Sequence, residues 1–375
     1  MKKIISLAVA ALMLLTSALA APVPPEIKAK SGVLMEKETG QVLYEKNAHE
    51  KLAPASVTKV MTLLLVTEAL DSGRIKLTDT VVVSKHAAGM GGSQVYLEEG
   101  EQMSLEDMLK AVIISSANDG AVALAEHVAG SHESFVALMN RRAKELGMND
   151  TNFINCTGLD AEGHVTSAYD IAVMSRELIK HDIIKKYSTI WMDSLRNGEF
   201  GLTNTNKLIK SYKGITGLKT GSTSIAKFSM SATAERDGME LIAAVMAAEN
   251  SQDRFESASK LLDFGFANYS LFDGTMDLSI DPVNVVLGTK NNVRAGLKDG
   301  GRVLIDKLDM SKIGRRIDMP DNIKAPVERG QKLGEMIILN DETELARIPI
   351  TAEEQVSKLD TKTLFWRMLS VLLVK

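Results

Sequence analysis

The sequence is short of several features, and each shortage excludes a class of protein. Its single cysteine, Cys156, excludes an intramolecular disulfide and a metal site built from several thiolates. The net charge of −4 leaves no basic surplus of the kind found in nucleic-acid-binding proteins. No apolar run reaches the ~20 residues that a membrane-spanning helix needs. With 375 residues, 45% apolar and 25% charged, the chain has the composition of a soluble globular protein with one large or two ordinary domains.

Histidine is present but forms no metal-binding pattern. No two histidines lie on one helical face with a glutamate, as a zinc peptidase requires. We therefore expect no metal site, and we interpret most of the six as surface or helix-packing residues: His49, His86, His127, His132, His164 and His181.

Residues 1–20 have the pattern of a bacterial secretory signal peptide. Two lysines precede a run of twelve residues that is apolar except for Ser6, and Ala18-Leu19-Ala20 supplies small residues at a cleavage site. The apolar run is too short to span a membrane. We expect an exported protein whose mature chain begins near Ala21.

Residues 21–270 combine strand patterns at both ends with a helical block between them. Strand-like segments near 33–44 and 218–247 flank residues 56–190, where serine N-caps and glycine stops indicate helices. A further helix is expected over about 252–266. Because the two strand regions need a common core, we expect an α+β domain: one antiparallel sheet with an inserted helical subdomain.

The remaining sequence follows two other patterns. In residues 277–355 short apolar runs alternate with Asn, Asp and Gly turn signals, which predicts a small all-β domain. Residues 361–375 predict a C-terminal amphipathic helix, on which Arg367 and Ser370 form a narrow polar stripe and Trp366 suits the headgroup level. We expect this helix to lie in the membrane interface; docking on its own protein or a dimer contact is the alternative.

The first chemical motif is Ser56-Val57-Thr58-Lys59, at the expected start of a helix. A serine and a lysine three residues apart lie on one helical face, where backbone N–H groups are also free. The amine can take the proton of the hydroxyl, and the N–H groups can stabilise a developing oxyanion. Taken alone, the motif is more commonly a capping serine followed by a surface lysine.

Two further motifs follow. Ser116-Ala117-Asn118 lies at a break between predicted helices, where a hydroxyl and an amide can face one cleft. Lys219-Thr220-Gly221 lies on a predicted strand, where its first and third residues face the same way and glycine lets another backbone approach. Ordinary loop chemistry would also explain the former, and a β-bulge the latter.

In this order, the three motifs are the signature of penicillin-binding proteins and class A β-lactamases. The chain more specifically resembles the D-alanyl-D-alanine carboxypeptidases of the low-molecular-mass penicillin-binding protein type, serine peptidase family S11. The resemblance covers about residues 30–375 and includes 91–93, 155–159 and 166–170. It implies a β-lactamase/transpeptidase-like domain over 21–270, followed by the small all-β domain and the terminal helix.

The resemblance also implies a role for each motif residue. Ser56 would be the nucleophile that forms an acyl-enzyme, and Lys59 its general base. Ser116 would relay a proton toward the leaving amine, and Asn118 would hold the substrate amide. Backbone N–H groups of Ser56 and Ser222 would form the oxyanion hole.

The substrate's terminal carboxylate would be bound by the strand motif. Lys219 would supply the positive charge, helped by Thr220, with Gly221 beside them and Arg254 assisting. Two departures from the family pattern concern how the carboxylate is bound. Many members have histidine where this chain has Ser222, and some have an arginine near the stretch 204–207.

The two motif lysines lead to an electrostatic hypothesis. Lys59 and Lys219 should both approach Ser56, and two ammonium groups in one cleft raise each other's free energy. One pKa should therefore fall, which would supply a neutral Lys59 near neutral pH, and the pair should titrate jointly.

The implied activity is removal of the terminal D-alanine from peptidoglycan stem pentapeptides, with β-lactams such as penicillin acylating the same serine. No cofactor and no nucleic acid are implied. The signal peptide and terminal helix together place the protein peripherally on the outer face of the bacterial cytoplasmic membrane.

Two alternatives stay open. A β-lactamase would need a glutamate and an asparagine to hold a deacylating water; Glu145 and Asn149 have the spacing but fall at a predicted helix end. A non-catalytic cell-wall binding protein of the same fold would show a broken motif, and all three motifs are intact.

Overall fold

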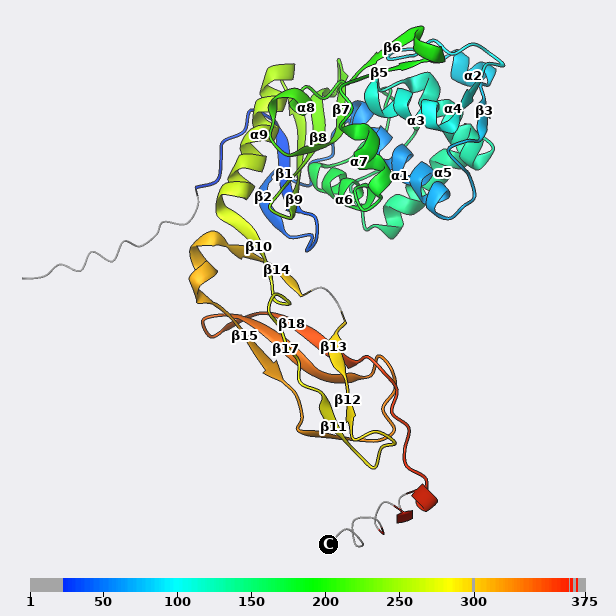
Figure 1. The fold of residues 1–375 in the computed structure, drawn as a ribbon. Helices are drawn as coiled ribbons and strands as arrows, with labels where there is room; N and C mark the ends of the chain where they lie inside the picture. Colours follow the sequence, from blue (N-terminus) through cyan, green and yellow to red (C-terminus); the bar gives the residue numbers. More distant parts are fainter. Residues whose placement is uncertain (1–22, 299–300, 364, 367–368, 370–375) are drawn as a thin grey trace, which may run out of the picture.

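The computed structural model describes residues 23–298, 301–363, 365–366 and 369. Figure 1 shows a broad part in which helices pack around a sheet, and a slender β part that continues the chain from α9 (Ser251–Asn268). The predicted signal peptide, residues 1–20, lies outside the described residues.

One antiparallel sheet joins the two ends of the broad part. Its strand order is β2-β1-β9-β8-β7, and β1 pairs with β9 over Ser31↔Met246 to Glu36↔Leu241. This pairing of early with late strands confirms the predicted sheet with an inserted helical block. The strands are β1 (Ser31–Glu36), β2 (Val42–Lys46), β7 (Ile215–Thr223), β8 (Lys227–Arg236) and β9 (Met239–Ala248).

Helices cover one face of this sheet, and α9 covers the other (Figure 1). Along β9, Ile242 and Ala244 pack with the helical block, whereas Leu241 and Ala243 pack with α9. This alternation follows from the two-residue period of a strand. The helices are α1 (Lys59–Asp71), α2 (Lys85–Ala88), α3 (Leu105–Ile114), α4 (Asn118–Ala129), α5 (His132–Glu145), α6 (Ala168–Leu178), α7 (Asp182–Ser188), α8 (Leu208–Ser211) and α9 (Ser251–Asn268).

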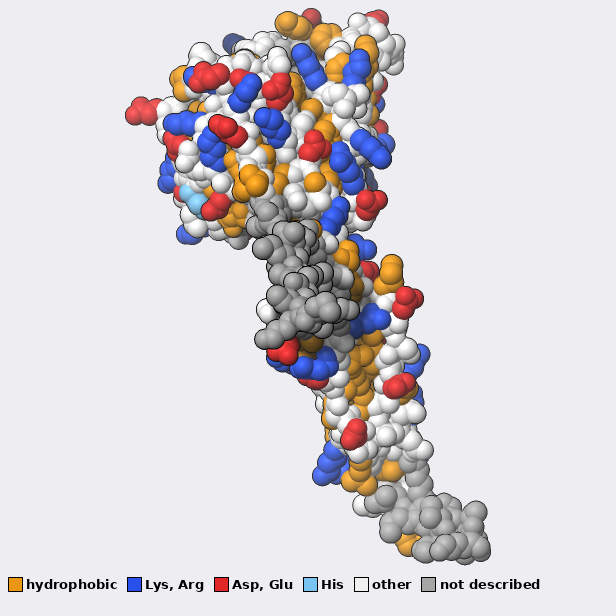
Figure 2. Space-filling view, turned by 90° about the vertical axis from the view of Figure 1, so that its left-hand side faces the viewer, with side chains coloured by type: hydrophobic (Ala, Val, Ile, Leu, Met, Phe, Trp, Pro, Cys, Tyr) orange, Lys and Arg blue, Asp and Glu red, His pale blue; other side chains and the backbone are white. Residues whose placement is uncertain are grey.

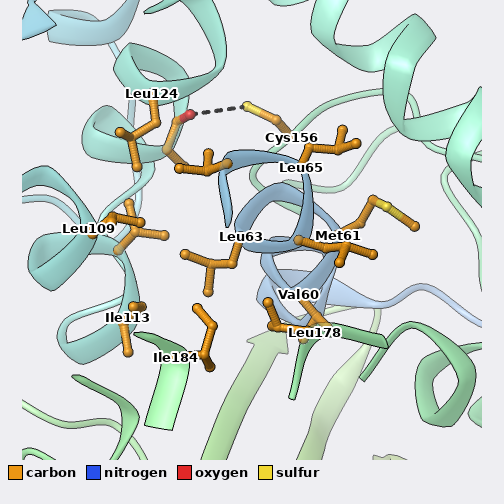
Figure 3. Close-up of a cluster of buried hydrophobic side chains, with 14 of the residues drawn as sticks. Val60, Met61, Leu63, Leu65, Leu109, Ile113, Leu124, Cys156, Leu178 and Ile184 are labelled. Atoms are coloured by element: carbon orange, nitrogen blue, oxygen red, sulfur yellow. Dashed lines mark hydrogen bonds between the residues drawn. The ribbon is translucent and has the colours of Figure 1, made fainter. Parts of the chain in front are cut away.

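Helix α1 is the centre of the main core. It is buried along nearly its whole length because it is apolar on all sides rather than amphipathic. Figure 3 shows its side chains among those of the neighbouring helices: Val60, Met61, Leu63 and Leu65 with Leu109, Ile113, Leu124, Leu178 and Ile184. The start of α1, which carries the first motif, is thereby fixed in position.

Side-chain caps fix where several helices begin. Ser104, Ser131 and Ser167 each accept a hydrogen bond from the backbone N–H three residues later, as their sequence positions predicted. Asn250 does the same for α9. Small elements complete this part: β3 (Thr80–Val82), β4 (Gln102–Ser104), β5 (Met192–Leu195), β6 (Phe200–Thr203) and the 3₁₀ turns η1 (Ala55–Thr58) and η2 (Arg196–Gly198).

From Tyr269 to Ala352 the described residues form the slender part, which is built from strands and the 3₁₀ turn η3 (Lys307–Lys312). Its sheets have the orders β13-β18-β17-β15, β12-β11-β16 and β10-β14, and β11 with β16 is a parallel pair. Two apolar clusters fill it, one around Met336 and Ile338 and the other around Val285 and Val327. Its elements are β10 (Tyr269–Asp273), β11 (Val283–Val286), β12 (Asn292–Val293), β13 (Ala295–Leu297), β14 (Arg302–Asp306), η3 (Lys307–Lys312), β15 (Ile313–Asp318), β16 (Asn322–Lys324), β17 (Lys332–Asn340) and β18 (Thr343–Ala352).

The molecular surface and the C-terminal segment add two facts. On the face in Figure 2, cationic and anionic side chains are interspersed over the broad part, without a patch of one sign. Within the described residues, no helix has the length and apolarity to cross a membrane. Much of the predicted terminal helix, 361–375, lies outside the described residues, whereas Phe365 and Trp366 are described and exposed.

Candidate active site

Ser56 lies in η1, the 3₁₀ turn that leads directly into α1. Lys59 is the first residue of α1, so the first motif spans the junction. The turn begins at Ala55, whose φ of 48° is unusual for a residue other than glycine. Such a backbone conformation persists only where the surrounding structure holds it in place. Here Gly158 and Gly221 allow neighbouring segments to pack directly against the turn.

Lys59 is completely buried and connects three segments of the chain. Its Nζ lies 3.0 Å from Ser56 Oγ, 2.6 Å from Asn118 Oδ1 and 2.8 Å from the backbone oxygen of Thr157. Burial disfavours the ammonium form and lowers the pKa of Lys59 to about 7, although the nearby Asp119 carboxylate opposes the shift. A neutral amine is therefore available beside the Ser56 hydroxyl at neutral pH.

The second motif lies where α3 ends and α4 begins, as its sequence position predicted. Ser116 is buried with a φ of 62°, so the chain turns sharply between the two helices. Asn118 uses both ends of its amide, accepting from Lys59 and donating to the Gly91 oxygen at 2.7 Å. The Asn118 side chain therefore faces the serine–lysine pair.

The third motif approaches from strand β7. Lys219 is buried, and its Nζ donates to Ser116 Oγ at 2.8 Å. Burial, together with the charges of Lys59 and Arg254, lowers the pKa of Lys219 well below its usual value. The hydroxyls of Thr220 and Thr205 are 2.8 Å apart. The structure thus brings the two lysines into one cluster, in which Lys59 is hydrogen-bonded to Ser56 and Lys219 is hydrogen-bonded to Ser116.

Glycine is required where β7 and the loop at 158 meet η1. A Cβ at Gly221 would lie 2.9 Å from the backbone nitrogens of Ser56 and Val57. Gly158 has a φ of +87°, and a Cβ there would lie 1.8 Å from the Ala55 oxygen. Both glycines allow backbone to pack directly on the turn that holds the nucleophile.

We expect Gly221→Ala to slow acylation of Ser56 by penicillin at least about tenfold. The added methyl must push β7 away from backbone atoms that cannot yield, and displacements of this order at a reacting centre cost up to ~100-fold. The measurement is the second-order rate constant of acylation, made on protein whose melting temperature shows that it is folded.

Gly201→Ala is the matched control for this glycine. Gly201 lies on β6, has an ordinary φ, and has open space where the Cβ would be. It should acylate like the unaltered protein. If Gly221→Ala acylated as fast as this control, close packing of β7 on η1 would not matter for the reaction.

Arg254 and Ser222 occupy different positions around β7. The Arg254 guanidinium is buried, donates to the Gly221 oxygen at 3.2 Å and packs on the Phe255 ring. Burial lowers its pKa to about 10, so it remains cationic at neutral pH. Ser222 follows Gly221 on β7 with its side chain exposed. Arg254 therefore supports the backbone of the third motif and adds positive charge to the region.

Glu145 lies far from the cluster. It is the last residue of α5 and pairs with Arg142, which also binds Glu68 near the end of α1. Nine residues of helix, about 13 Å, separate Glu68 from Lys59. Glu145 therefore does not hold a water beside Ser56 in this structure, and its position supports the interpretation as a helix-end residue.

Sequence reasoning missed several residues that complete the cluster. The Thr157 oxygen accepts from Lys59, but a backbone carbonyl has no signature in the sequence. Buried His164 accepts from the Ile154 N–H through Nδ1, so its Nε2 donates to Thr58 Oγ1. It is a packing residue that fixes the start of α1, as most of the histidines were expected to be.

The assembled site has a buried serine–lysine pair, a second lysine–serine pair and backbone N–H groups at the turn. It contains a nucleophile, a base of suitable pKa and positive charge for an anionic substrate group. Within the described residues, no group of three or more His, Cys, Asp or Glu side chains could hold a metal ion. Fold and site together define a serine enzyme of the acyl-transferring type.

Comparison with known proteins identifies the family. Residues 18–250 match Peptidase_S11, D-alanyl-D-alanine carboxypeptidase, and residues 277–358 match the penicillin-binding protein 5 C-terminal domain. The chain therefore belongs to the S11 D-alanyl-D-alanine carboxypeptidase family, which confirms the predicted resemblance, the fold class and the serine carboxypeptidase activity.

Individual relatives match either nearly the whole chain or about two thirds of it. The D-alanyl-D-alanine carboxypeptidase DacF of Bacillus subtilis is 43% identical over 96% of this chain and 95% of that protein. Penicillin binding protein 5 from Haemophilus influenzae has a TM-score of 0.78 at 31% identity, covering 90% of this chain and 99% of the other. Penicillin-Binding Protein D2 from Listeria monocytogenes, solved in an ampicillin-bound form, has a TM-score of 0.59 at 31% identity and covers 64% of this chain and 98% of the other.

Proposed function

We propose that the protein removes the terminal D-alanine of peptidoglycan stem pentapeptides through an acyl-enzyme on Ser56. The observation that carries the proposal is the buried Lys59 amine, 3.0 Å from Ser56 Oγ and with a pKa of about 7. A base of this pKa is half neutral at neutral pH, where general-base catalysis is most effective.

Acylation follows from the contacts in the cluster. Ser56 Oγ attacks the carbonyl carbon of the penultimate D-alanine while Lys59 takes its proton. Backbone N–H groups of Ser56 and Ser222 stabilise the oxyanion. The C–N bond then breaks, and the leaving amine takes up the proton held by Lys59 by way of the Ser116 hydroxyl, whose Oγ accepts a hydrogen bond from Lys219. With Lys59 neutral again, water attacks the ester and gives up a proton to Lys59. That proton returns to Ser56 Oγ when the shortened peptide leaves.

Binding of the substrate's carboxylate orients the scissile bond. Lys219 and the Thr220 hydroxyl lie on the same strand as Gly221, beside the nucleophile. The carboxylate would favour the ammonium form of Lys219, opposing the effect of burial on its pKa. Arg254 adds positive charge from behind the strand, and the Asn118 amide would hold the substrate's peptide group.

β-Lactams would be attacked by the same serine. Their strained amide and carboxylate have the geometry of the D-Ala-D-Ala terminus, so the same groups would orient them. The ampicillin-bound relative from Listeria monocytogenes supports this proposal.

Release of D-alanine from a synthetic stem pentapeptide by the mature protein tests the proposal. We expect release, together with a stable covalent adduct on Ser56 after exposure to penicillin. A protein that releases no D-alanine but turns over penicillin rapidly would instead be a β-lactamase.

We also propose that the protein is exported and held on the outer face of the bacterial cytoplasmic membrane by residues 361–375. The sequence of residues 1–20 supports export, and the exposed Phe365 and Trp366 suit the membrane interface, where aromatic rings partition favourably. The slender β part would then act as a spacer between this segment and the active site.

A chain ending at Asp360 should bind lipid vesicles at least about fivefold less than the full mature chain. Co-sedimentation with vesicles that contain anionic and zwitterionic lipids measures the bound fraction. D-alanine release in solution is the control and should be equal for the two chains. Equal vesicle binding would show that residues 361–375 do not tether the protein.

A further inference from the structure

The turn between β11 and β12 lies beside the segment that leads to the C-terminus. The Leu359 N–H donates to the Leu287 oxygen at 2.8 Å, and the Thr289 N–H donates to the Ser357 oxygen at 2.8 Å. Figure 1 shows β11 and β12 at the end of the slender β part that lies away from the broad part. Residues 361–363, directly after this contact, are helical. The turn is therefore held next to the segment proposed as the membrane tether.

Two large apolar side chains at this turn face the solvent. Val286 is 47% exposed and Leu287 is 36% exposed. Burial alternates along β11, so that Val283 and Val285 fill a core of the slender β part while Val286 points outward. Side chains on the solvent face of a sheet are ordinarily polar, as Asn284 is here. Val286 and Leu287 therefore present apolar surface at the end of the molecule.

Two exposed lysines lie around this apolar pair. Lys324 of β16 is in register with Val286, so both side chains leave the sheet on the same side. Lys358 lies opposite Gly288 in an isolated β-bridge beside the turn. Among the described residues, neither lysine makes an ion pair with an Asp or Glu side chain. Both ammonium groups are therefore available to an external anion.

The acidic residues on either side of the segment 355–359 are already bound. Glu354 pairs with Lys290 and Arg294, and Asp360 accepts from the Thr363 N–H at 2.7 Å. They therefore leave the charge of the two lysines largely uncompensated. Exposed apolar side chains next to such lysines are typical of surfaces that contact a membrane, where apolar atoms enter the acyl boundary and ammonium groups bind lipid phosphates.

We propose that Val286, Leu287, Lys324 and Lys358, here called the tip surface, form a second membrane contact that binds anionic phospholipids. The apolar pair would enter the boundary between headgroups and acyl chains, and the lysines would bind the phosphates. Two contacts at one end would hold the slender β part at a fixed angle to the membrane, whereas a terminal helix alone leaves it free to pivot. The inference rests on the proposed tether at 361–375 and adds a separate lipid-binding surface to it.

Vesicle binding by the full mature chain tests the charge of the tip surface. One set of vesicles contains phosphatidylglycerol with phosphatidylcholine, and the other contains phosphatidylcholine alone. Lys324→Gln/Lys358→Gln should lower the partition coefficient for the anionic vesicles at least about fivefold, because each lysine near an anionic surface contributes about this factor. Binding to phosphatidylcholine should be unchanged, and the difference on anionic vesicles should shrink at high salt.

The matched control for charge is Lys85→Gln/Lys144→Gln, which removes two exposed lysines of the broad part. It should bind anionic vesicles within about twofold of the unaltered chain. An equal loss in this control and in the tip variant would show attraction by overall charge and would overturn the assignment.

Val286→Ser/Leu287→Ser tests the apolar half of the tip surface. It should lower binding to both kinds of vesicle at least about threefold, because less apolar area leaves water on binding. Val82→Ser/Met192→Ser is the matched control, since these two residues are 57% and 65% exposed on the broad part. This control should bind like the unaltered chain.

The outcomes separate the tip surface from the tether. Equal vesicle binding by the chain ending at Asp360 and by the full chain would overturn the tether. Unaltered vesicle binding by both tip variants would overturn only the tip surface. Every variant should release D-alanine from a soluble pentapeptide at the rate of the unaltered chain, which shows that a loss of vesicle binding does not come from unfolding.

Discussion

Ser56→Ala is expected to lower D-alanine release from a stem pentapeptide by at least about 10³-fold and to abolish covalent labelling by penicillin. The variant removes the only atom that can form the ester, while Lys59, Asn118 and Lys219 keep their other contacts. Nucleophile deletions in comparable enzymes leave only the catalysis supplied by binding and by the oxyanion hole. Substrate should therefore still bind, with kcat affected far more than KM.

The measurement pairs a D-alanine assay with intact-protein mass spectrometry after exposure to penicillin. Ser194→Ala is the matched control, because Ser194 is an exposed serine on β5. This control should retain activity and gain the mass of one penicillin. A penicillin adduct on the Ser56→Ala protein would place the nucleophile elsewhere.

Motif spacing predicted the elements on which the site residues lie, but not how these elements meet. Lys59 falls one helical turn after Ser56, so their contact follows from local geometry. The contact between Lys219 and Ser116 joins residues more than a hundred positions apart, and only the family resemblance pointed to it. The Thr157 carbonyl that binds Lys59 could not be found, because every residue has such a group.

The fold shows the same division between local and distant information. Serine caps such as Ser104 and Ser167 act within one helical turn, so the sequence reveals them. The sheet of the broad part was predictable because two strand regions flanked a helical block. In the slender part, the short apolar runs predicted strands but not which strands pair. The parallel pairing of β11 with β16 depends on packing between residues distant in the sequence, which no local pattern indicates.

Burial of Lys59 gives its amine the pKa that a general base needs at neutral pH. Its amine is enclosed, so the ammonium form loses hydration and the pKa falls to about 7. Cys156 lies close by, but burial raises the pKa of its thiol to about 12, so it carries no charge at neutral pH. Asp119 is then the nearby anion that limits the shift, and its carboxylate is occupied by the backbone N–H groups of Val95 and Leu97.

The rate of acylation should follow the neutral form of Lys59. Below pH 7 the amine is protonated and cannot accept the Ser56 proton, so the second-order rate constant for penicillin should fall about tenfold per pH unit. Above pH 7 it should level off. Because Lys59 and Lys219 share one cluster, the apparent pKa of this limb belongs to the pair. A profile without an acid limb between about pH 5.5 and 8 would contradict the assignment of the base.

Two replacements of Lys59 distinguish a role as general base from a role as a positive charge alone. Lys59→Arg keeps the charge, but a guanidinium stays protonated throughout the accessible pH range and cannot accept a proton. Lys59→Met removes charge and base together and retains an unbranched side chain. If Lys59 acts as the base, both variants should lose at least about 10³-fold in acylation, and any residual rate should lack the limb near pH 7. If arginine restored acylation to within about tenfold of the unaltered enzyme while methionine did not, Lys59 would act by its charge, and the proton of Ser56 would have to leave by the other lysine, Lys219, through Ser116.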